Sequence, residues 1–364
     1  MKATGHCISI HILTLIVFLK CLTVSAGEGL DRRSAEAQSP AGEQRLQFML
    51  SLYRRCADRT GRPRQPRRLG SNTVRLVRPS SSPPVSTPAA DPWHTHSVDY
   101  ELKILPKEKL LKVAFVHLRA PSLRHQPISC DIAVTSRGPA GETSWGGRVV
   151  FRAEEQWTEM DITPHVLERT ADRLSLAIQY RCVQESPQSS RRRRTRELSS
   201  ERAQLREPAL LLYLDDKGKT DWQNLHGPEP VSPPHSRKAR QVGSIGSDIP
   251  NYLQKNSVVR NQCKLHPYRV TFRDLGWEHW IIAPYKYNPH YCKGDCPRIL
   301  HYGYNSPNHA IVQNFINELA NNDVPPPACV PYKYKPISVL MMEKNGSIVY
   351  KEYEDMIAES CTCR

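Results

Sequence analysis

The chain has 364 residues, 30 prolines, 11 cysteines and a formal net charge of +15. From residue 241 onward it carries 13 Lys+Arg against 11 Asp+Glu, so most of the excess lies earlier in the chain. There it is concentrated in Arg/Pro/Ser tracts without interleaved aromatic residues, which argues against a nucleic-acid surface. No Ser/His/Asp order or nucleophile elbow stands out, so we expect neither an enzyme nor a cofactor.

Residues 1–26 are typical of a secretory signal peptide. Lys2 gives a basic start, residues 8–19 form an apolar run, and Val24-Ser25-Ala26 offers small residues for cleavage. The run is short for a membrane span, and no later stretch approaches that length. We therefore expect a secreted, extracellular protein with no membrane span, in which disulfides persist.

A single amphipathic helix is expected over Gly42–Asp58. Apolar residues recur there at steps of three and four, at Leu46, Met49, Leu50, Tyr53 and Ala57. The helix either packs on its own domain or covers an apolar groove elsewhere in the precursor. Residues 59–92 are rich in Pro, Ser and Arg, and we expect no regular structure in them.

Residues 98–215 favour an antiparallel β sandwich, because short apolar runs alternate with Gly/Pro turns. The expected strands are 102–104, 111–118, 128–135, 148–151, 174–180 and 209–214. Cys130 and Cys182 fall on or beside two of these strands and are candidates for a disulfide. Cys56 is then left over, without an assigned role.

Two basic runs, Arg191–Arg196 and Arg237–Arg240, fit the Arg-x-x-Arg rule of furin-like convertases. We favour cleavage after Arg240, with Arg237 and Arg240 as the recognised basic residues. Cleavage at the earlier run would separate the strand at 209–214 from the middle domain, to which it belongs. The chain then divides into a signal (1–26), a prodomain (27–240) and a mature region (241–364). The prodomain comprises a helix and linker (27–97), a β domain (98–215) and a second linker (216–240).

The mature region is expected to contain two hairpins and one helix. In the first hairpin, strand 268–272 pairs with strand 280–283. Ser306 caps a helix over residues 308–321, and Pro307 occupies its first position. The second hairpin joins 337–343 to 348–353 through a type I′ turn at Asn345-Gly346. Asn345 is also a candidate glycosylation site, because Asn345-Gly346-Ser347 is an N-x-S sequence.

Six cysteines dominate this region, four of them in the clusters CKGDC (292–296) and CTC (361–363). If the first members of the clusters pair, and the last members pair, they close a ring that a third disulfide can thread. Gly294 leaves room in that ring, because it has no Cβ. Six cysteines allow 15 connectivities, so spacing alone leaves the pairing open. Zinc binding by four thiolates is the rival interpretation, and in a secreted chain we expect no metal.

Two slender hairpins and a helix cannot enclose one compact core, and disulfides have to compensate. No third layer within the chain covers the apolar stripe of the helix, in which Ile311, Phe315 and Leu319 align. A second chain is the natural cover.

The motifs LGWEHWIIAP, YCKGDC, NSPNHAIVQ, CVPYKYKPISVL and CTCR resemble the mature domain of the transforming growth factor β superfamily, in its bone morphogenetic protein branch. The resemblance implies a small, disulfide-rich β fold, a cystine-knot cytokine with two β-hairpin fingers and one helix. It also implies the disulfides Cys263–Cys329, Cys292–Cys361 and Cys296–Cys363. Ala328 stands where most members carry the cysteine that links two subunits, which implies a non-covalent dimer and is typical of the oocyte subgroup.

The function implied by the resemblance is that of a secreted growth factor. It would assemble type I and type II receptor serine/threonine kinases and activate SMAD signalling, as a homodimer or a heterodimer with growth differentiation factor nine, in oocyte–granulosa cell communication. The alternative is a secreted cystine-knot antagonist. The implied type I surface contains Trp277, Trp280, Ile299 and Leu300. The implied type II surface contains Ala283, Pro284, Ser338, Leu340 and Tyr350.

Overall fold

The computed structural model describes residues 40–81, 93–120, 127–138, 141–166, 173–185, 195–197, 204–218, 261–300 and 302–364. They belong to two compact units. The first unit comprises residues up to 55, residues 67–215 and residues 340–351, and the second comprises residues 56–66, 216–339 and 352–364. Residues 340–351, from the carboxy-terminal region, therefore belong to the first unit. No helix among these residues has the length and apolarity that a membrane crossing requires.

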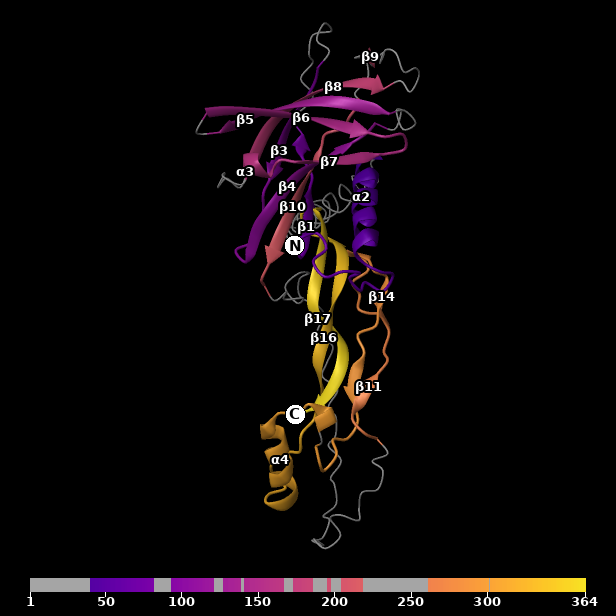
Figure 1. Cartoon of the computed structure of the whole chain (residues 1–364), viewed down its shortest axis with the longest axis vertical. Coiled ribbons are helices and arrows are strands. Elements are labelled where there is room, and N and C mark those ends of the chain that lie inside the picture. The colour runs from indigo at the N-terminus through magenta and orange to yellow at the C-terminus, as the bar shows by residue number, and fades with distance from the viewer. Residues whose placement is uncertain are drawn as a thin grey trace, which may run out of the picture. The chain divides into compact units, whose positions relative to one another are not determined.

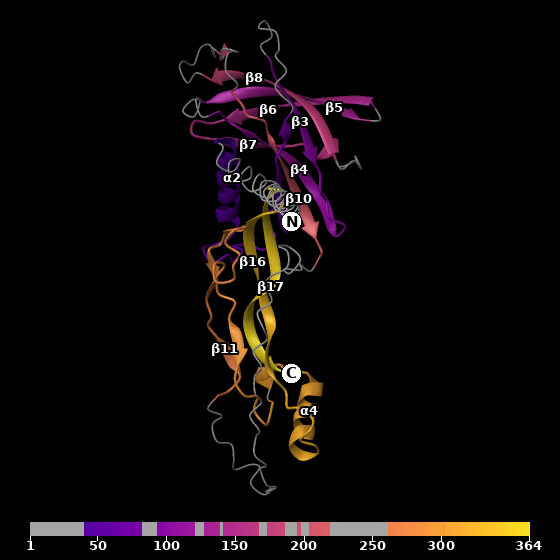
Figure 2. The same ribbon diagram turned by 180° about the vertical axis from the view of Figure 1, so that it is seen from behind.

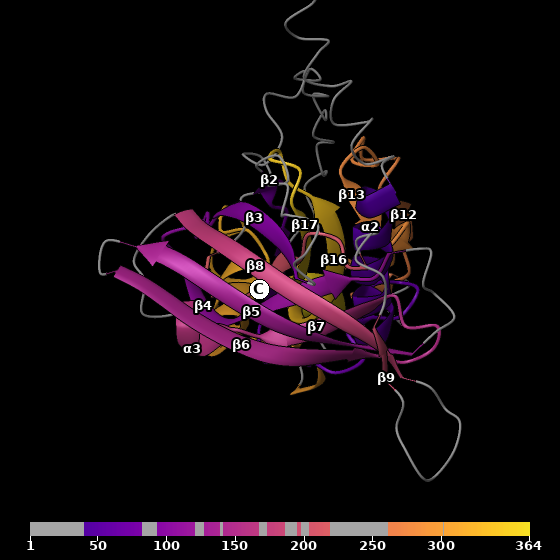
Figure 3. The ribbon, with the colours of Figure 1, turned by 90° about the horizontal axis from the view of Figure 1, so that it is seen from above.

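The first unit contains a two-layer β sandwich. One layer has the strand order β2-β3-β8-β5-β6, and the other has β1-β10-β4-β7 (Figures 1 and 3). The first layer's strands are β2 (Ser80–Ser81), β3 (His94–Glu101), β5 (Ile128–Gly138), β6 (Gly141–Phe151) and β8 (Arg173–Glu185), with β9 (Thr195–Glu197) paired to β8. The second layer's strands are β1 (Thr73–Val77), β4 (Glu108–Leu118), β7 (Trp157–Asp161) and β10 (Ala209–Asp216), and the short helix α3 spans Thr163–Val166.

The sandwich core follows from alternation along the strands. In β8, every second residue from Leu174 to Cys182 is buried, because side chains at i and i+2 share one face of a strand. These residues meet Val113 and Phe115 of β4 in one apolar cluster. Cys130 lies directly opposite Cys182 across β5 and β8, and the two form a disulfide. The sandwich predicted from the sequence is therefore confirmed, and the candidate pair is bonded.

Two predictions for the amino-terminal half are wrong. Residues 59–92 do contain regular structure, because Thr73–Val77 forms the buried strand β1 between β10 and β17. Residues 102–104 are not a strand. The first strand of that region is β3, whose end at Glu101 precedes them. The composition of residues 73–77 does not predict a strand. The strand forms because β10 and β17 pair with it on its two sides.

Helix α2 spans Pro40–Cys56, close to the predicted range. Of the predicted stripe, Met49, Tyr53 and Ala57 are buried and Leu46 and Leu50 are half-buried, and the buried face also includes Phe48 and Leu52. The ring of Phe48 meets Trp157 edge to face at 5.8 Å, and the Gln44 side chain donates to the carbonyls of Arg119 and Gln156. Figure 2 shows the helix beside β7.

The second unit is built from short strands and from most of two long ones, β16 and β17, whose residues within 340–351 belong to the first unit. Its elements are β11 (Lys264–His266), β12 (Val270–Thr271), β13 (Ile281–Ala283), β14 (Lys286–Tyr287), β15 (Tyr291–Lys293), a 3-10 turn η3 (Tyr302–Tyr304), α4 (Asn308–Leu319), β16 (Cys329–Met342) and β17 (Ile348–Cys363). Strands β16 and β17 are neighbours and form the long hairpin, with β13 beside β16.

Three local predictions here need correction. Strand β12 pairs with β14, Val270 opposite Tyr287, and not with residues 280–283. Helix α4 has Pro307 as its N-cap, with no side-chain cap hydrogen bond, so Ser306 does not cap it. The turn of the long hairpin has a positive φ at Gly346 but not at Asn345, so it is not type I′. Its closing bonds, Gly346 N to Glu343 O and Glu343 N to Ser347 O, are those of a type I turn followed by a glycine bulge.

Candidate functional site

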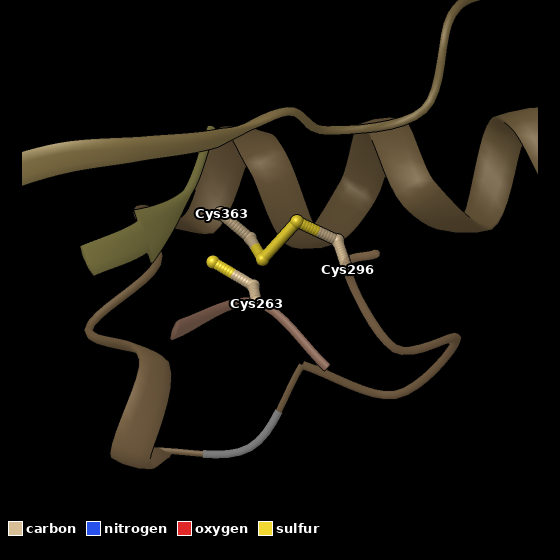
Figure 4. Close-up of side chains that lie close together, drawn as sticks. All are labelled: Cys263, Cys296 and Cys363. Carbon is tan, nitrogen blue, oxygen red and sulfur yellow. A yellow bond between two sulfur atoms is a disulfide. The ribbon is translucent and has the colours of Figure 1, made fainter. Parts of the chain in front are cut away.

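Three interlaced disulfides hold the bases of the fingers together. They join Cys263 to Cys329, Cys292 to Cys361 and Cys296 to Cys363, which are the pairs implied by the resemblance. The sulfurs of Cys263, Cys296 and Cys363 lie within 4.8 Å of one another (Figure 4). All six cysteines of the region are in these bonds, so none supplies a thiolate for zinc or for a bond between subunits.

Gly294 lies where the chain passes through the disulfide ring. Its φ is +130°, and a Cβ at this position would stand 2.6 Å from the carbonyl oxygen of Asn261 and 2.5 Å from that of Gln262. The same passage is held by the bond from Asp295 N to Asn261 O and by the bond from Cys263 N to Asp295 O. Glycine is required here because the threading backbone, rather than a flexible side chain, occupies the space.

Helix α4 presents an uncovered apolar face. The exposed fraction is 57% at Val312, 42% at Phe315 and 62% at Leu319. The opposite face is anchored, since the Asn314 side chain donates to the carbonyls of Pro297 and Arg298. In Figures 1 and 2 the helix stands away from the long strands of its own unit. A contiguous apolar face of this kind on a secreted chain is typical of an interface.

The residues predicted for the type I surface divide by exposure. Ile299 is exposed, Leu300 packs against the knot, and Trp277 is half-buried. Trp280 is only 4% exposed, with its ring 5.6 Å from that of Trp277. Trp277 in turn stacks on Phe272. In this structure Trp280 is therefore a packed residue.

Most of the residues implied for the type II surface are covered in the precursor. Four are buried, Pro284, Ser338, Leu340 and Tyr350, and Ala283 is half-buried. In the second unit, the covering residue is Gly61. Its carbonyl accepts from Ser338 N at 2.7 Å, and an added Cβ would lie 2.8 Å from Pro284.

In the first unit, the covering segments are strand β1 and helix α2. Strand β1 pairs antiparallel with the start of β17, which places Val74 opposite Tyr350. The Tyr53 ring of α2 meets the Tyr350 ring edge to face at 6.3 Å. Segments from the amino-terminal half therefore lie against Pro284, Ser338 and Tyr350 of the predicted type II surface.

A buried ion-pair network reinforces the contact of β1 with the fingertip, residues 340–351. Arg75 donates to both carboxylate oxygens of Glu108, at 2.9 and 2.7 Å, and to Glu343 at 3.1 and 3.2 Å. Burial, the largest single cause, would lower the Arg75 pKa, but the hydrogen bonds and charges of Glu108 and Glu343 together outweigh it, and the pKa is raised above its ordinary value. Sequence reasoning missed Arg75 and Gly61, since both lie in the stretch expected to be irregular.

Two other predicted sites have different outcomes. The convertase residues Arg237 and Arg240, like the signal peptide, lie outside the described residues. Asn345 is exposed in the turn, and its side-chain oxygen accepts from Ser347 N at 2.9 Å.

The comparisons with known proteins agree with this geometry. The model of the transforming growth factor beta like domain matches residues 262–363. Bone morphogenetic protein 15 of Bos taurus is 42% identical over 88% of this chain and 83% of its own length, and the Homo sapiens protein is 40% identical over 88% and 83%. Growth/differentiation factor 9 of Capra hircus is 32% identical over 88% of this chain and 81% of its own length. The resemblance expected from the sequence motifs is thereby confirmed.

Proposed function

Because this chain belongs to the transforming growth factor β family and is one of its growth factors, we propose that residues 241–364 act outside the cell as a dimeric ligand. The ligand assembles type I and type II receptor serine/threonine kinases, which then activate SMAD signalling. It does no chemistry itself: the receptors carry the catalytic domains. As in the oocyte subgroup, the target would be the granulosa cell of the ovarian follicle.

The observation that carries the proposal is the uncovered apolar face of α4 beside a disulfide knot that uses all its cysteines. A second copy, or growth differentiation factor nine, would bury Val312, Phe315 and Leu319 without a covalent link. Ala328, exposed beside the knot, offers no sulfur for an intersubunit bond. The dimer would bring its two sets of receptor surfaces together.

We further propose that residues 27–240 form a prodomain and that a furin-like convertase cleaves after Arg240. The burial of Ser338 and Tyr350 supports this, because receptor contact at these residues would require the amino-terminal cover to leave. A glycan on Asn345 is compatible with the exposure of that side chain.

The test uses purified residues 241–364, alone and mixed with growth differentiation factor nine, on granulosa cells carrying a SMAD reporter. Activation by either preparation supports a ligand. An antagonist would instead lower the signal of an added agonist, and that result would overturn the proposal. The matched control is the full precursor carrying Arg237→Ala and Arg240→Ala, which should be inactive at the same concentration.

A further inference from the structure

Three histidines line one end of the sandwich interior of the first unit. His94 and His96 of β3 lie on the same strand face as the buried residues Val98 and Tyr100. Their rings stack on Tyr180 of β8, with centroids 5.1 and 5.3 Å away and interplanar angles of 23°. At these two positions of the inward strand face, imidazole rings replace the apolar side chains that fill the rest of the core.

The third histidine, His117 of β4, is 1% exposed and packs edge to face on Phe115 at 5.8 Å. The Nε2 atoms of all three rings are buried without a hydrogen-bond partner in the described part of the chain. A neutral imidazole fits each of these sites. At His94 and His117, an imidazolium would bring an additional N–H and a charge to a position where the described residues provide no acceptor, whereas at His96 the Leu205 backbone offers a hydrogen bond to the charged form.

Few charged groups face the cluster. Glu207 is the only carboxylate among the described residues that acts on His96, and the Leu205 backbone also favours its charged form. The Glu207 carboxylate also attracts the Arg45 guanidinium of α2, so its charge is shared with a second cation. Tyr100, Arg78 and Arg206 are the other titratable groups that interact with Arg45. The groups that act on His117 and His96 from within the cluster are other histidines. One shared carboxylate cannot neutralise three imidazolium ions.

Burial lowers the pKa of each ring. The pKa of His94 is lowered by burial alone, and that of His96 is lowered by burial despite Glu207. Burial, with a smaller contribution from His96, lowers the pKa of His117 to about 4. A metal centre does not fit: in the described residues, only the knot cysteines place three ligand atoms within 4.8 Å of one another.

We propose that the His94, His96 and His117 cluster makes the sandwich an acid-labile clamp, which loosens on acidification and releases the fingertip, residues 340–351. The fingertip belongs to the same unit and is paired to β1, a strand of the sandwich. Its consequence for receptor access rests on the proposed function, whereas the acid lability itself does not.

The direction of the pH dependence follows from proton linkage. The unfolded chain binds protons at the ordinary histidine pKa of about 6.5, and the folded chain binds them only at lower pH. The contribution of the neutral histidines to the free energy of unfolding is therefore fully present above about pH 6.5 and is lost as the pH falls toward 4. With a folded pKa of about 4, His117 alone would lower the folding equilibrium constant about 30-fold between pH 7.5 and pH 5.

The first experiment follows urea unfolding of the full precursor at pH 7.5 and pH 5. Between pH 7.5 and pH 5, we expect the folding equilibrium constant of the wild type to fall about 30-fold further than that of His117→Phe. The control His165→Gln, at an exposed ring stacked on Trp145 of the same unit, should behave as wild type. Equal losses in wild type and His117→Phe would overturn the proposal. If His117→Phe does not fold, His94→Phe/His96→Phe takes its place, with a smaller loss than wild type expected.

Hydrogen exchange at the imidazole C2 position of the wild-type precursor, read by mass spectrometry, gives each pKa without a mutation. A His117 midpoint near 6.5 would overturn the proposal, and a midpoint well below it supports the proposal. Release is read by gel filtration of convertase-treated precursor: the two chains should co-elute at pH 7.5 and separate at pH 5, but remain together at pH 5 in the histidine variants. Separation of wild type and variants alike would reject the clamp, and it would leave the receptor function untouched.

Discussion

Arg75 of β1 and Glu343 at the fingertip turn form an ion pair across 268 positions of sequence, with Nη2 3.1 Å from Oε1. Side-chain exposure is 4% for Arg75 and 25% for Glu343, and Glu108, which shares the same guanidinium, is 2% exposed. A buried charge is tolerated only when it is paired, so each member of this network depends on the others. The network thus ties the fold of the sandwich to the position of the fingertip.

Arg75→Met should destabilise the first unit by about 3–5 kcal/mol, because it leaves the Glu108 carboxylate buried without its partner. Glu343→Gln should cost less, about 1–2 kcal/mol, since the amide oxygen still accepts from Arg75. Urea unfolding of the precursor at neutral pH measures both.

The control for this network is Lys103→Met. Lys103 pairs with Glu101 at 3.1 Å, but both side chains are more than 60% exposed. Exposed pairs contribute about 0–1 kcal/mol, so little change is expected. If Arg75→Met lowered the free energy of unfolding no more than Lys103→Met does, the network would not stabilise the first unit.

Gly294→Ala should block formation of the knot. The added Cβ would meet the threading backbone of residues 261–262 at 2.5–2.6 Å, and neither partner can move while the disulfides are closed. Secreted protein should fall sharply, and peptide mapping of the remainder should show disulfides other than the three native pairs.

Gly276→Ala is the matched control for the knot. Gly276 also has a positive φ, of +70°, but nothing lies within 4 Å of the added Cβ. It should therefore cost only the backbone strain of about 1–2 kcal/mol. Native pairing and near-normal secretion in Gly294→Ala would contradict the role given to the glycine.

Leu319→Glu and Phe315→Glu should abolish the non-covalent dimer of residues 241–364, because each places a charge in the centre of the proposed interface. Sedimentation of the wild type at micromolar concentration should show a dimer that runs as a monomer on non-reducing denaturing gels. His309→Glu, at an exposed position of the same helix that lies outside the stripe of Val312, Phe315 and Leu319, should leave the dimer intact. A dimer that persisted in both apolar-face variants would place the interface elsewhere.

Gly61→Ala should open the cover over Pro284 and Ser338. The added methyl would stand 2.7 Å from Ile337 and 2.8 Å from Pro284, at a φ of +80°. Binding of a type II receptor ectodomain to the uncleaved precursor should rise severalfold, measured by surface plasmon resonance.

Gly70→Ala separates backbone strain from the clash. Its φ is +74°, and nothing lies within 4 Å of the added Cβ. Its receptor binding should stay at the wild-type level, so that any strain common to the two substitutions is accounted for. Equal binding by the two variants would show that Gly61 does not guard this surface.

Sequence patterns were most informative where one element carries its own signal. The apolar run Ala209–Leu214, the stripe of α4 and the spacing of CKGDC and CTC each predicted a feature that the structure contains. The family motifs then supplied a pairing that spacing left open. These features depend on residues near one another in the chain, or on motifs that a family shares.

Only the tertiary structure decided which surfaces are covered. Strand β1 forms in an Arg/Pro/Ser-rich stretch because β10 and β17 supply partners on both sides, and they lie more than 130 and 270 positions away in the chain. No sequence pattern showed that the implied type II residues Pro284, Ser338 and Tyr350 are covered in the precursor. They are covered because Gly61, Tyr53 and β1 reach them from the other end of the chain. The histidines of β3 and β4 likewise resemble surface residues until the second layer of the sandwich closes over them. Burial is a property of contacts between distant segments, and no local pattern of residues encodes it.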